Sequence, residues 1–195
     1  MDFDSKATTI HLESLAYFAA NPDDSTANFD LAIEYEAIGN TSSALTHYLR
    51  AAERTDDETL AYECLICASV CISRQGERGF TQSHLLKQAI CVMPERPEAY
   101  FFLCKYYEAN KENYDCYFLA SIALGMCDFT YSIFDAYPNC YNYLGRDGLE
   151  LCKAVSGIHW EKLEESKEIF SRLAEESAWP EIRSLCKSNL EVLGL

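Results

Sequence analysis

The sequence has little positive charge and few residues that break helices. Lys and Arg total 16 against 31 Asp and Glu, which gives a formal net charge of −15. Such a surface repels a phosphate backbone and an anionic membrane, so neither nucleic-acid binding nor membrane attachment is expected. Eight Gly and five Pro, with 49% hydrophobic residues, argue against collagen-like and disordered classes.

Export and membrane-spanning signals are also missing from the sequence. The first four residues are acidic or apolar, whereas a secretory signal begins with basic residues. The longest uncharged stretch near the middle, residues 116–127, has 12 residues. A helix needs about 20 to cross a bilayer. We therefore expect a cytoplasmic protein with no membrane insertion.

The known catalytic motifs are absent as well. The sequence holds no Gly-rich phosphate loop, no Gly-x-Ser-x-Gly elbow and no His-Glu-x-x-His pair. Acidic residues cluster at 56–58 and 164–165, where a turn and an exposed helix face are expected, so we predict that solvent surrounds them. His84 and Cys91 share a helix face but have no third group to orient the imidazole. We expect no enzyme activity and no cofactor.

Ten cysteines are the unusual feature of the composition. Without an export signal, free thiols are expected. Cys64, Cys67 and Cys71 are spaced to lie on one helix face, which raises the alternative of a soft-metal site. The four histidines are scattered and no other close cysteine pair exists. The favoured interpretation is that these cysteines act as small buried side chains between helices.

Residues 28–51 carry a helix-turn-helix pattern that reads NFDLAIEYEAIGNTSSALTHYLRA. Leu31 and Tyr35 share a face of a first helix, Gly39 ends that helix, and small Ala44 and Ala51 allow close packing of a second helix. This order of residues resembles the tetratricopeptide repeat (TPR) family. Asn28 stands where the family has Trp, and Phe29 is expected to take over part of its packing.

Further copies follow at steps near the family period of about 34 residues. The resemblance implies an all-α fold, a TPR-like right-handed superhelix (α-solenoid) of about four helix pairs in one domain over residues 1–195. Capping helices are expected at 8–20 and 180–193. The repeats are predicted at about 25–57, 58–95, 97–126 and 140–177, with an aromatic connection containing Phe129, Tyr131, Phe134 and Tyr137 before the last.

The order of these parts from about residue 25 to 195 also resembles the helical-repeat region that accompanies family-2 glycosyltransferases in bacteria and bacteriophages. The catalytic domain of those proteins is absent from this sequence. The resemblance implies a bacterial cell or an infected host as the setting. A separately encoded glycosyltransferase is one implied partner.

A superhelix of this family presents a concave groove lined by the first helix of each pair. The groove is expected to bind a basic or amphipathic segment of a protein partner through apolar contacts and an acidic rim. The alternative is that Phe101 and Phe102 are covered by the chain itself. The residues expected to line the groove are Phe29, Ile33, Ile66, Val70, Phe101, Phe102 and Lys105.

Three functions follow as hypotheses. The first is a non-catalytic scaffold or adaptor that binds a partner segment. The second is a structural subunit that associates through its convex or end surfaces. The third is a thiol or metal-binding protein that uses the three cysteines spaced along 64–71.

Overall fold

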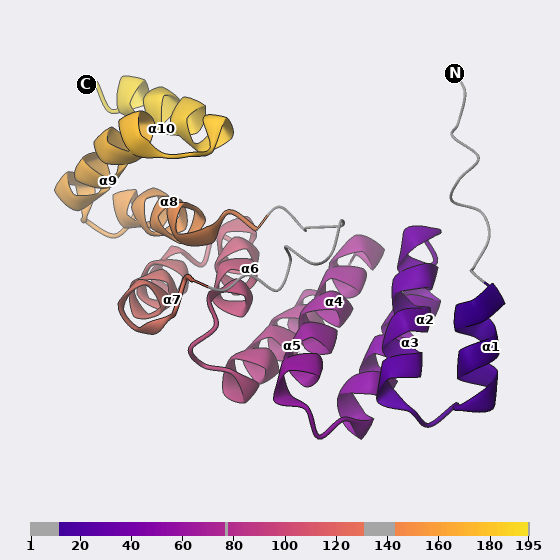
Figure 1. Ribbon diagram of the computed structural model, residues 1–195. Helices are drawn as coiled ribbons and strands as arrows, with labels where there is room; N and C mark the ends of the chain where they lie inside the picture. Colours follow the sequence, from indigo (N-terminus) through magenta and orange to yellow (C-terminus); the bar gives the residue numbers. More distant parts are fainter. Residues whose placement is uncertain (1–11, 77, 131–142, 195) are drawn as a thin grey trace, which may run out of the picture. The chain divides into compact units, whose positions relative to one another are not determined.

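The computed structural model describes residues 12–76, 78–130 and 143–194, and all regular secondary structure in these ranges is helical (Figure 1). The all-α prediction is confirmed. The helices are α1 (Leu12–Ala20), α2 (Ser25–Ala37), α3 (Thr41–Arg54), α4 (Glu58–Gln75), α5 (Gly79–Val92), α6 (Pro97–Ala109), α7 (Asn113–Met126), α8 (Gly145–Ile158), α9 (Leu163–Glu176) and α10 (Pro180–Val192).

The helices group into two compact units, one ending at Met93 and the other beginning at Pro94. The first holds α1 to α5 and the second holds α6 to α10. Parts of four predictions lie outside the described residues: positions 8–11 of the first cap, position 77 of the second repeat, positions 140–142 of the fourth repeat, and Tyr131, Phe134 and Tyr137 of the aromatic connection. The repeat boundaries stay predictions.

Three helix pairs are joined by turns of the same geometry. Gly39, Lys111 and Glu161 each lie two residues before the second helix of a pair, with φ of 77°, 60° and 56°. The next backbone N–H in each turn donates to a carbonyl five residues earlier, over 2.8 to 3.0 Å. This is the Schellman arrangement, in which a left-handed residue ends the helix. Glycine adopts that conformation without strain, whereas Lys111 and Glu161 do not.

Lys111→Gly is expected to raise the free energy of unfolding by about 0.5–1 kcal/mol. Relief of the left-handed strain, roughly 1–2 kcal/mol, exceeds the extra entropy that glycine gives the unfolded chain, roughly 0.4–1 kcal/mol. Chemical denaturation measures the difference. Lys111→Ala is the matched control, because it removes the same side chain and keeps the strain. Equal stability of the two variants would contradict the argument.

In the first unit, consecutive helices pack against each other from α1 through α5. Ala32 of α2 and Ala44 and Ala51 of α3 are fully buried, and such small side chains permit the close helix packing that the sequence predicts. Asn28, which stands where the family has Trp, is itself fully buried. Its amide donates to the carbonyls of Pro22 and Asp24, at 3.0 and 2.8 Å.

His47 of α3 completes this buried polar group. Its Nδ1 lies 3.0 Å from Asn28 Oδ1, and its ring stacks on Tyr35 at a centroid distance of 5.5 Å. Burial lowers the pKa of His47, and the charge of Arg50 adds to that effect. The folded state therefore takes up a proton on this ring less readily than the unfolded state does.

We expect the free energy of unfolding to fall as the pH is lowered from 7.5 to 5.5, partly because of His47. The unfolded state, with a histidine pKa near 6.5, binds the proton first, and this proton uptake favours unfolding. Denaturation of wild type and His47→Gln at both pH values isolates the contribution. The loss of stability should be smaller in His47→Gln, and an equal or larger loss would contradict the assignment.

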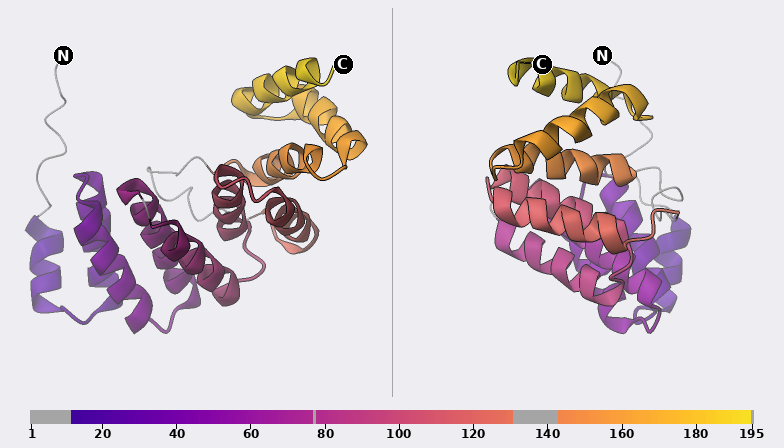
Figure 2. Two further views of the ribbon diagram at one scale, coloured as in Figure 1. Left: turned by 180° about the vertical axis from the view of Figure 1, so that it is seen from behind. Right: turned by 90° about the vertical axis from the view of Figure 1, so that its left-hand side faces the viewer.

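In the second unit, α7 and α8 both pack on α6, and α9 contacts both α8 and α10 (Figure 2). Gly148 of α8 allows a close approach, because a Cβ there would lie 2.7 Å from the ring of Phe101. Fully buried Phe170 is at the centre of the core shared by α8, α9 and α10. Its neighbours in that core are Leu151, Ala154, Leu173, Ala174, Ile182 and Cys186.

Candidate protein-interaction surface

The residues predicted to line a groove have very different exposures in the structure. Phe29, Ile66, Phe101 and Phe102 are each less than a tenth exposed. Ile33 and Val70 are half-buried and Lys105 is exposed, where it forms an ion pair with Glu108.

Ring packing accounts for the burial of the three phenylalanines. The ring of Phe29 lies 5.8 Å from that of Tyr48, and the ring of Phe101 lies 5.4 Å from that of Tyr143. Tyr143 precedes α8 and also lies against Phe102. These phenylalanines stabilise their own units and have little surface open to a partner. Binding at Ile33, Val70 and Lys105 stays a prediction.

A row of exposed apolar side chains lies on one face of α7. Four large side chains spaced four residues apart, here named the α7 stripe, make up this row: Tyr114, Phe118, Ile122 and Met126, exposed by 50%, 41%, 51% and 51%. Asp115 is the only charged residue among the 14 of α7. A helix face turned to water normally carries charged and polar side chains. The α7 stripe therefore departs from the pattern of an ordinary surface helix.

The other second helices show that the fold does not require this row. Helices α3, α5, α7 and α9 are each 14 residues long, and the stripe occupies the second, sixth, tenth and fourteenth positions of α7. The same positions are Ser42, Thr46, Arg50 and Arg54 in α3, Phe80, His84, Gln88 and Val92 in α5, and Glu164, Glu168, Arg172 and Glu176 in α9. Within the described residues, only α7 fills all four positions with large apolar side chains.

Trp160, in the turn between α8 and α9, widens the N-terminal end of the stripe. Its ring lies 4.6 Å from that of Tyr114 and 6.3 Å from that of Phe118, edge to face in both cases. Tyr114 and Phe118 are themselves 4.5 Å apart. Trp160 is 41% exposed, so the three rings form one accessible aromatic cluster. Trp and Tyr are enriched among the residues that dominate binding energy at protein interfaces.

An ion-paired network fixes this cluster to the rest of the unit. The hydroxyl of Tyr117 donates to Glu165 Oε2 over 2.6 Å, and Lys153 Nζ lies 2.6 Å from Glu165 Oε1. Hydrogen bonds from Lys153 and Tyr117 lower the pKa of Glu165, which keeps this carboxylate charged. Desolvation, helped by Glu165, raises the pKa of Tyr117 to about 12, so the phenol remains a donor. The network joins α7, α8 and α9 directly behind the aromatic cluster.

Carboxylates flank the stripe at both ends. Glu112, Asp115 and Glu161 are exposed near its N-terminal end, and none of them forms an ion pair within the described residues. At the other end lie exposed Glu95 and Asp128, which are held together by the 2.9 Å bond from the Asp128 N–H to the Glu95 carbonyl. Lys111 and Lys162 are the exposed bases near the N-terminal end.

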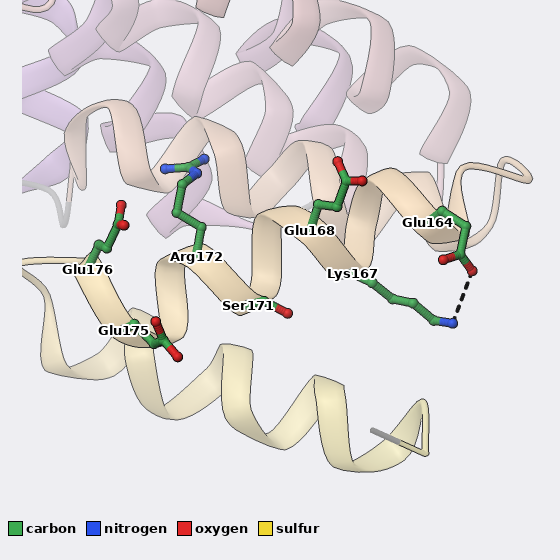
Figure 3. A pocket seen from close by; sticks show the side chains of 7 residues that line it. All are labelled: Glu164, Lys167, Glu168, Ser171, Arg172, Glu175 and Glu176. Carbon is green, nitrogen blue, oxygen red and sulfur yellow. Dashed lines mark hydrogen bonds and ion pairs between the residues drawn. The ribbon is translucent and has the colours of Figure 1, made fainter.

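The solvent face of α9 is a second, strongly acidic surface. Figure 3 shows its open depression, in which Lys167 pairs with Glu164 at 3.1 Å. Arg172 Nη2 lies 2.7 Å from Glu150 Oε2 of α8, so this guanidinium forms an ion pair within its own unit. The lining residues are Glu164, Lys167, Glu168, Ser171, Arg172, Glu175 and Glu176. These residues lack the buried, contrasting carboxylates that acid–base catalysis needs.

The cysteines that raised the metal alternative lie in the interior. Cys64, Cys67 and Cys71 are buried in α4, and desolvation raises the pKa of Cys71 to about 12. A neutral thiol is a poor metal ligand, since the thiolate is the form that binds. Among the residues that the structure describes, no group of three or more His, Cys, Asp or Glu could hold a metal ion.

Sequence reasoning did not single out a second group of thiols, Cys104, Cys116 and Cys152, on α6, α7 and α8. The Cys104 Sγ lies 3.7 Å from the Cys116 carbonyl, and the Cys116 Sγ lies 3.5 Å from the Cys104 carbonyl. Hydrogen bonding to Cys116 and burial raise the pKa values of Cys104 and Cys152. These thiols fill the helix crossing that alanines fill between α2 and α3, which is a structural role.

Sequence comparison gives no family: no family model matches the chain, and no curated protein matches it. Solved structures do match. Two crystal structures titled as MamA superpose with TM-scores of 0.62 and 0.59, at 14% and 13% identity. The first covers 83% of each chain, and the second covers 86% of this chain and 85% of that one.

A third structure, TTC0263, is titled a thermophilic TPR protein in Thermus thermophilus. It has a TM-score of 0.59 and 19% identity, and covers 91% of this chain and 87% of its own. At such identities the likeness shows the fold. The chain is an α-solenoid of the TPR type, as predicted. No helix in the described part of the chain is both long and apolar enough to cross a membrane.

Proposed function

We propose that this protein is a non-catalytic scaffold that binds another protein through the α7 stripe and Trp160. The observation that supports the proposal most directly is the row of four exposed apolar side chains on α7, where α3 and α9 carry polar residues. Apolar patches of this kind on soluble proteins mark interaction sites. The TPR-type fold supports the same function, because solenoids of this kind act through extended surfaces.

Co-purification from the native source tests the proposal. Tagged wild type should retain a defined protein that Phe118→Asp loses. Thr46→Asp is the matched control, since it places the same new charge at the equivalent exposed position of α3. Equal retention of every co-purifying protein by wild type and Phe118→Asp would contradict the proposal.

A separately encoded glycosyltransferase is our proposed client. The support is the order of segments shared with the repeat region that accompanies family-2 glycosyltransferases. Identification of the retained protein by mass spectrometry decides the matter. A glycosyltransferase that co-purifies with wild type but not with Phe118→Asp would support this client. A retained protein of another class would contradict it.

Self-association through the terminal helices is the second candidate. Leu185 and Val192 of α10 are 48% and 83% exposed, and Leu12 and Leu15 of α1 are 78% and 42% exposed. Two such ends favour head-to-tail contacts between copies. Light scattering over a range of concentrations separates the candidates. Growth in mass that Val192→Glu abolishes favours assembly, whereas a constant monomer mass favours the scaffold.

A further inference from the structure

We infer that the α7 stripe receives an amphipathic helix whose apolar face is flanked by Lys and Arg. This inference rests on the proposed function and adds to it the chemistry of the partner. Three observations carry it: the four-residue spacing of the stripe, the carboxylates at both its ends, and the aromatic cluster around Trp160.

The geometry of the stripe favours a helical partner. From Tyr114 to Met126 it spans 12 helical steps, a length of about 18 Å. Side chains spaced four residues apart form a ridge that fits between the rows of another helix. The backbone groups of α7 are engaged within the helix, so an extended segment would find no N–H or C=O partners there. A helix satisfies its own backbone groups and needs only side-chain contact.

The surrounding charge favours a basic partner. Glu112, Asp115 and Glu161 at one end have no ion-pair partner within the described residues. At the other end, hydrogen bonds from Thr130 lower the pKa of Asp128, so its carboxylate is ionised at neutral pH. The acidic face of α9 lies close by, since Tyr117 of α7 and Glu165 of α9 are hydrogen-bonded. Complementary charge of this kind speeds and orients association.

The same charges disfavour a second copy of this chain as the occupant. If two α7 stripes met antiparallel, Glu112 and Asp115 of one copy would face Glu95 and Asp128 of the other. If they met parallel, each carboxylate would face its own counterpart. Like charges opposed across an interface weaken binding, and the net charge of −15 adds to the repulsion.

The aromatic cluster supplies the strongest contact for such a helix. Tyr114, Phe118 and Trp160 are held in place by their mutual ring contacts and by the network behind them. A Leu, Ile or Met of the partner that packs among the three rings would be removed from water. Partly exposed, rigid rings lose little side-chain entropy on binding. We expect this end of the stripe to dominate the affinity.

Three synthetic 20-residue peptides test the inference with the full chain. The first places Leu on one helical face and Lys on its flanks, the second replaces each Lys with Glu, and the third scrambles the first. Fluorescence anisotropy of the labelled peptides should show the Lys peptide binding at least about 10-fold tighter than either of the others. Equal binding by the scrambled peptide would overturn the inference, because attraction would then be unspecific.

Variants of the protein locate the site. Phe118→Asp and Ile122→Asp should each lower the affinity for the Lys peptide by about 10-fold or more, although both add a negative charge. Thr46→Asp should leave binding within about 2-fold of wild type. The combination Glu112→Gln, Asp115→Asn and Glu161→Gln should weaken binding by about 3- to 10-fold at low salt. An unchanged affinity in this combination would overturn the assigned role of the carboxylates.

The outcomes separate this inference from the proposed function. If binding of a native partner depends on Phe118 but the Lys and Glu peptides bind equally, the proposed scaffold function is supported and the inference of a basic helical partner is overturned. If no native partner depends on Phe118, the scaffold itself fails. A dimer of the wild type that Phe118→Asp dissociates would also overturn the inference, because a second copy would then occupy the stripe.

Discussion

Replacing Glu98 with alanine is expected to lower the free energy of unfolding by about 3–5 kcal/mol. Glu98 is fully buried at the start of α6, and Arg96 beside it is 7% exposed. Arg96 Nη2 lies 2.7 Å from Glu98 Oε1, and Nε lies 3.3 Å from Oε2, so the carboxylate accepts two bonds from the guanidinium. Removal of the carboxylate takes both of these bonds away from a guanidinium that stays buried. Urea denaturation of the two proteins measures the loss.

A double variant distinguishes this explanation from a simple loss of contacts. Arg96→Met with Glu98→Leu removes both charges and keeps most of the volume, so it should recover most of the stability. Lys105→Ala, which removes an exposed ion pair with Glu108, should change the stability by less than about 1 kcal/mol. If the double variant were as unstable as Glu98→Ala, loss of the charge pairing between Arg96 and Glu98 would not be the cause.

Phe170→Ala is expected to cost about 3–5 kcal/mol for a different reason. The Phe170 ring is fully buried between α8, α9 and α10, where Leu173 and Ile182 are each 1% exposed. Truncation leaves a cavity that helices already in contact cannot close completely. Thermal or chemical unfolding measures the loss, and Phe170→Leu, which refills part of the space, should lose clearly less.

Ile122→Ala is the matched control for Phe170→Ala. Ile122 is 51% exposed on α7, so its removal should change the stability by no more than about 0.5 kcal/mol. A large loss would mean that the α7 stripe contributes to folding. A small loss, combined with loss of binding in Ile122→Asp, would mean that the stripe contributes to recognition instead.

The helix pair α2 and α3 could be predicted closely from the sequence. Gly39, Ala44 and Ala51 carry local signals: a left-handed turn residue and small side chains at helical spacing. The structure places each of them as expected, because the requirement of a close crossing is met within the pair itself. Lys111 and Glu161 adopt the same left-handed turn conformation, but neither is a glycine, so the sequence does not predict these two turns.

The exposed surface could not be predicted, because spacing shows which residues share a face and not what covers that face. Phe101 is expected either to line a groove or to be covered by the chain itself, and the structure places its ring 5.4 Å from that of Tyr143, just before α8. Phe118 was overlooked although it lies in the uncharged stretch at 116–127. That stretch belongs to the predicted third repeat and is too short to cross a bilayer, and its lack of charge on a surface helix is the signal that could have identified Phe118.

Buried polar residues were missed for a related reason. Asn28 and Glu98 have polar side chains, which composition assigns to the surface, yet both are fully buried. Their partners lie either in a neighbouring helix, as His47 does, or two residues away in a loop, as Arg96 does. Only the folded arrangement shows that these hydrogen-bond and ion-pair requirements are met inside the protein.

The common length of the four second helices has a consequence for how such a molecule can change over time. The second, sixth, tenth and fourteenth positions face water or are only partly covered in all four, and they hold polar residues in α3, mixed residues in α5, apolar residues in α7 and mainly acidic residues in α9. Substitutions at these four positions of one helix can therefore change its outer surface without changing the buried core. New partners can be gained, and old ones lost, by a few surface substitutions that leave the architecture as it is.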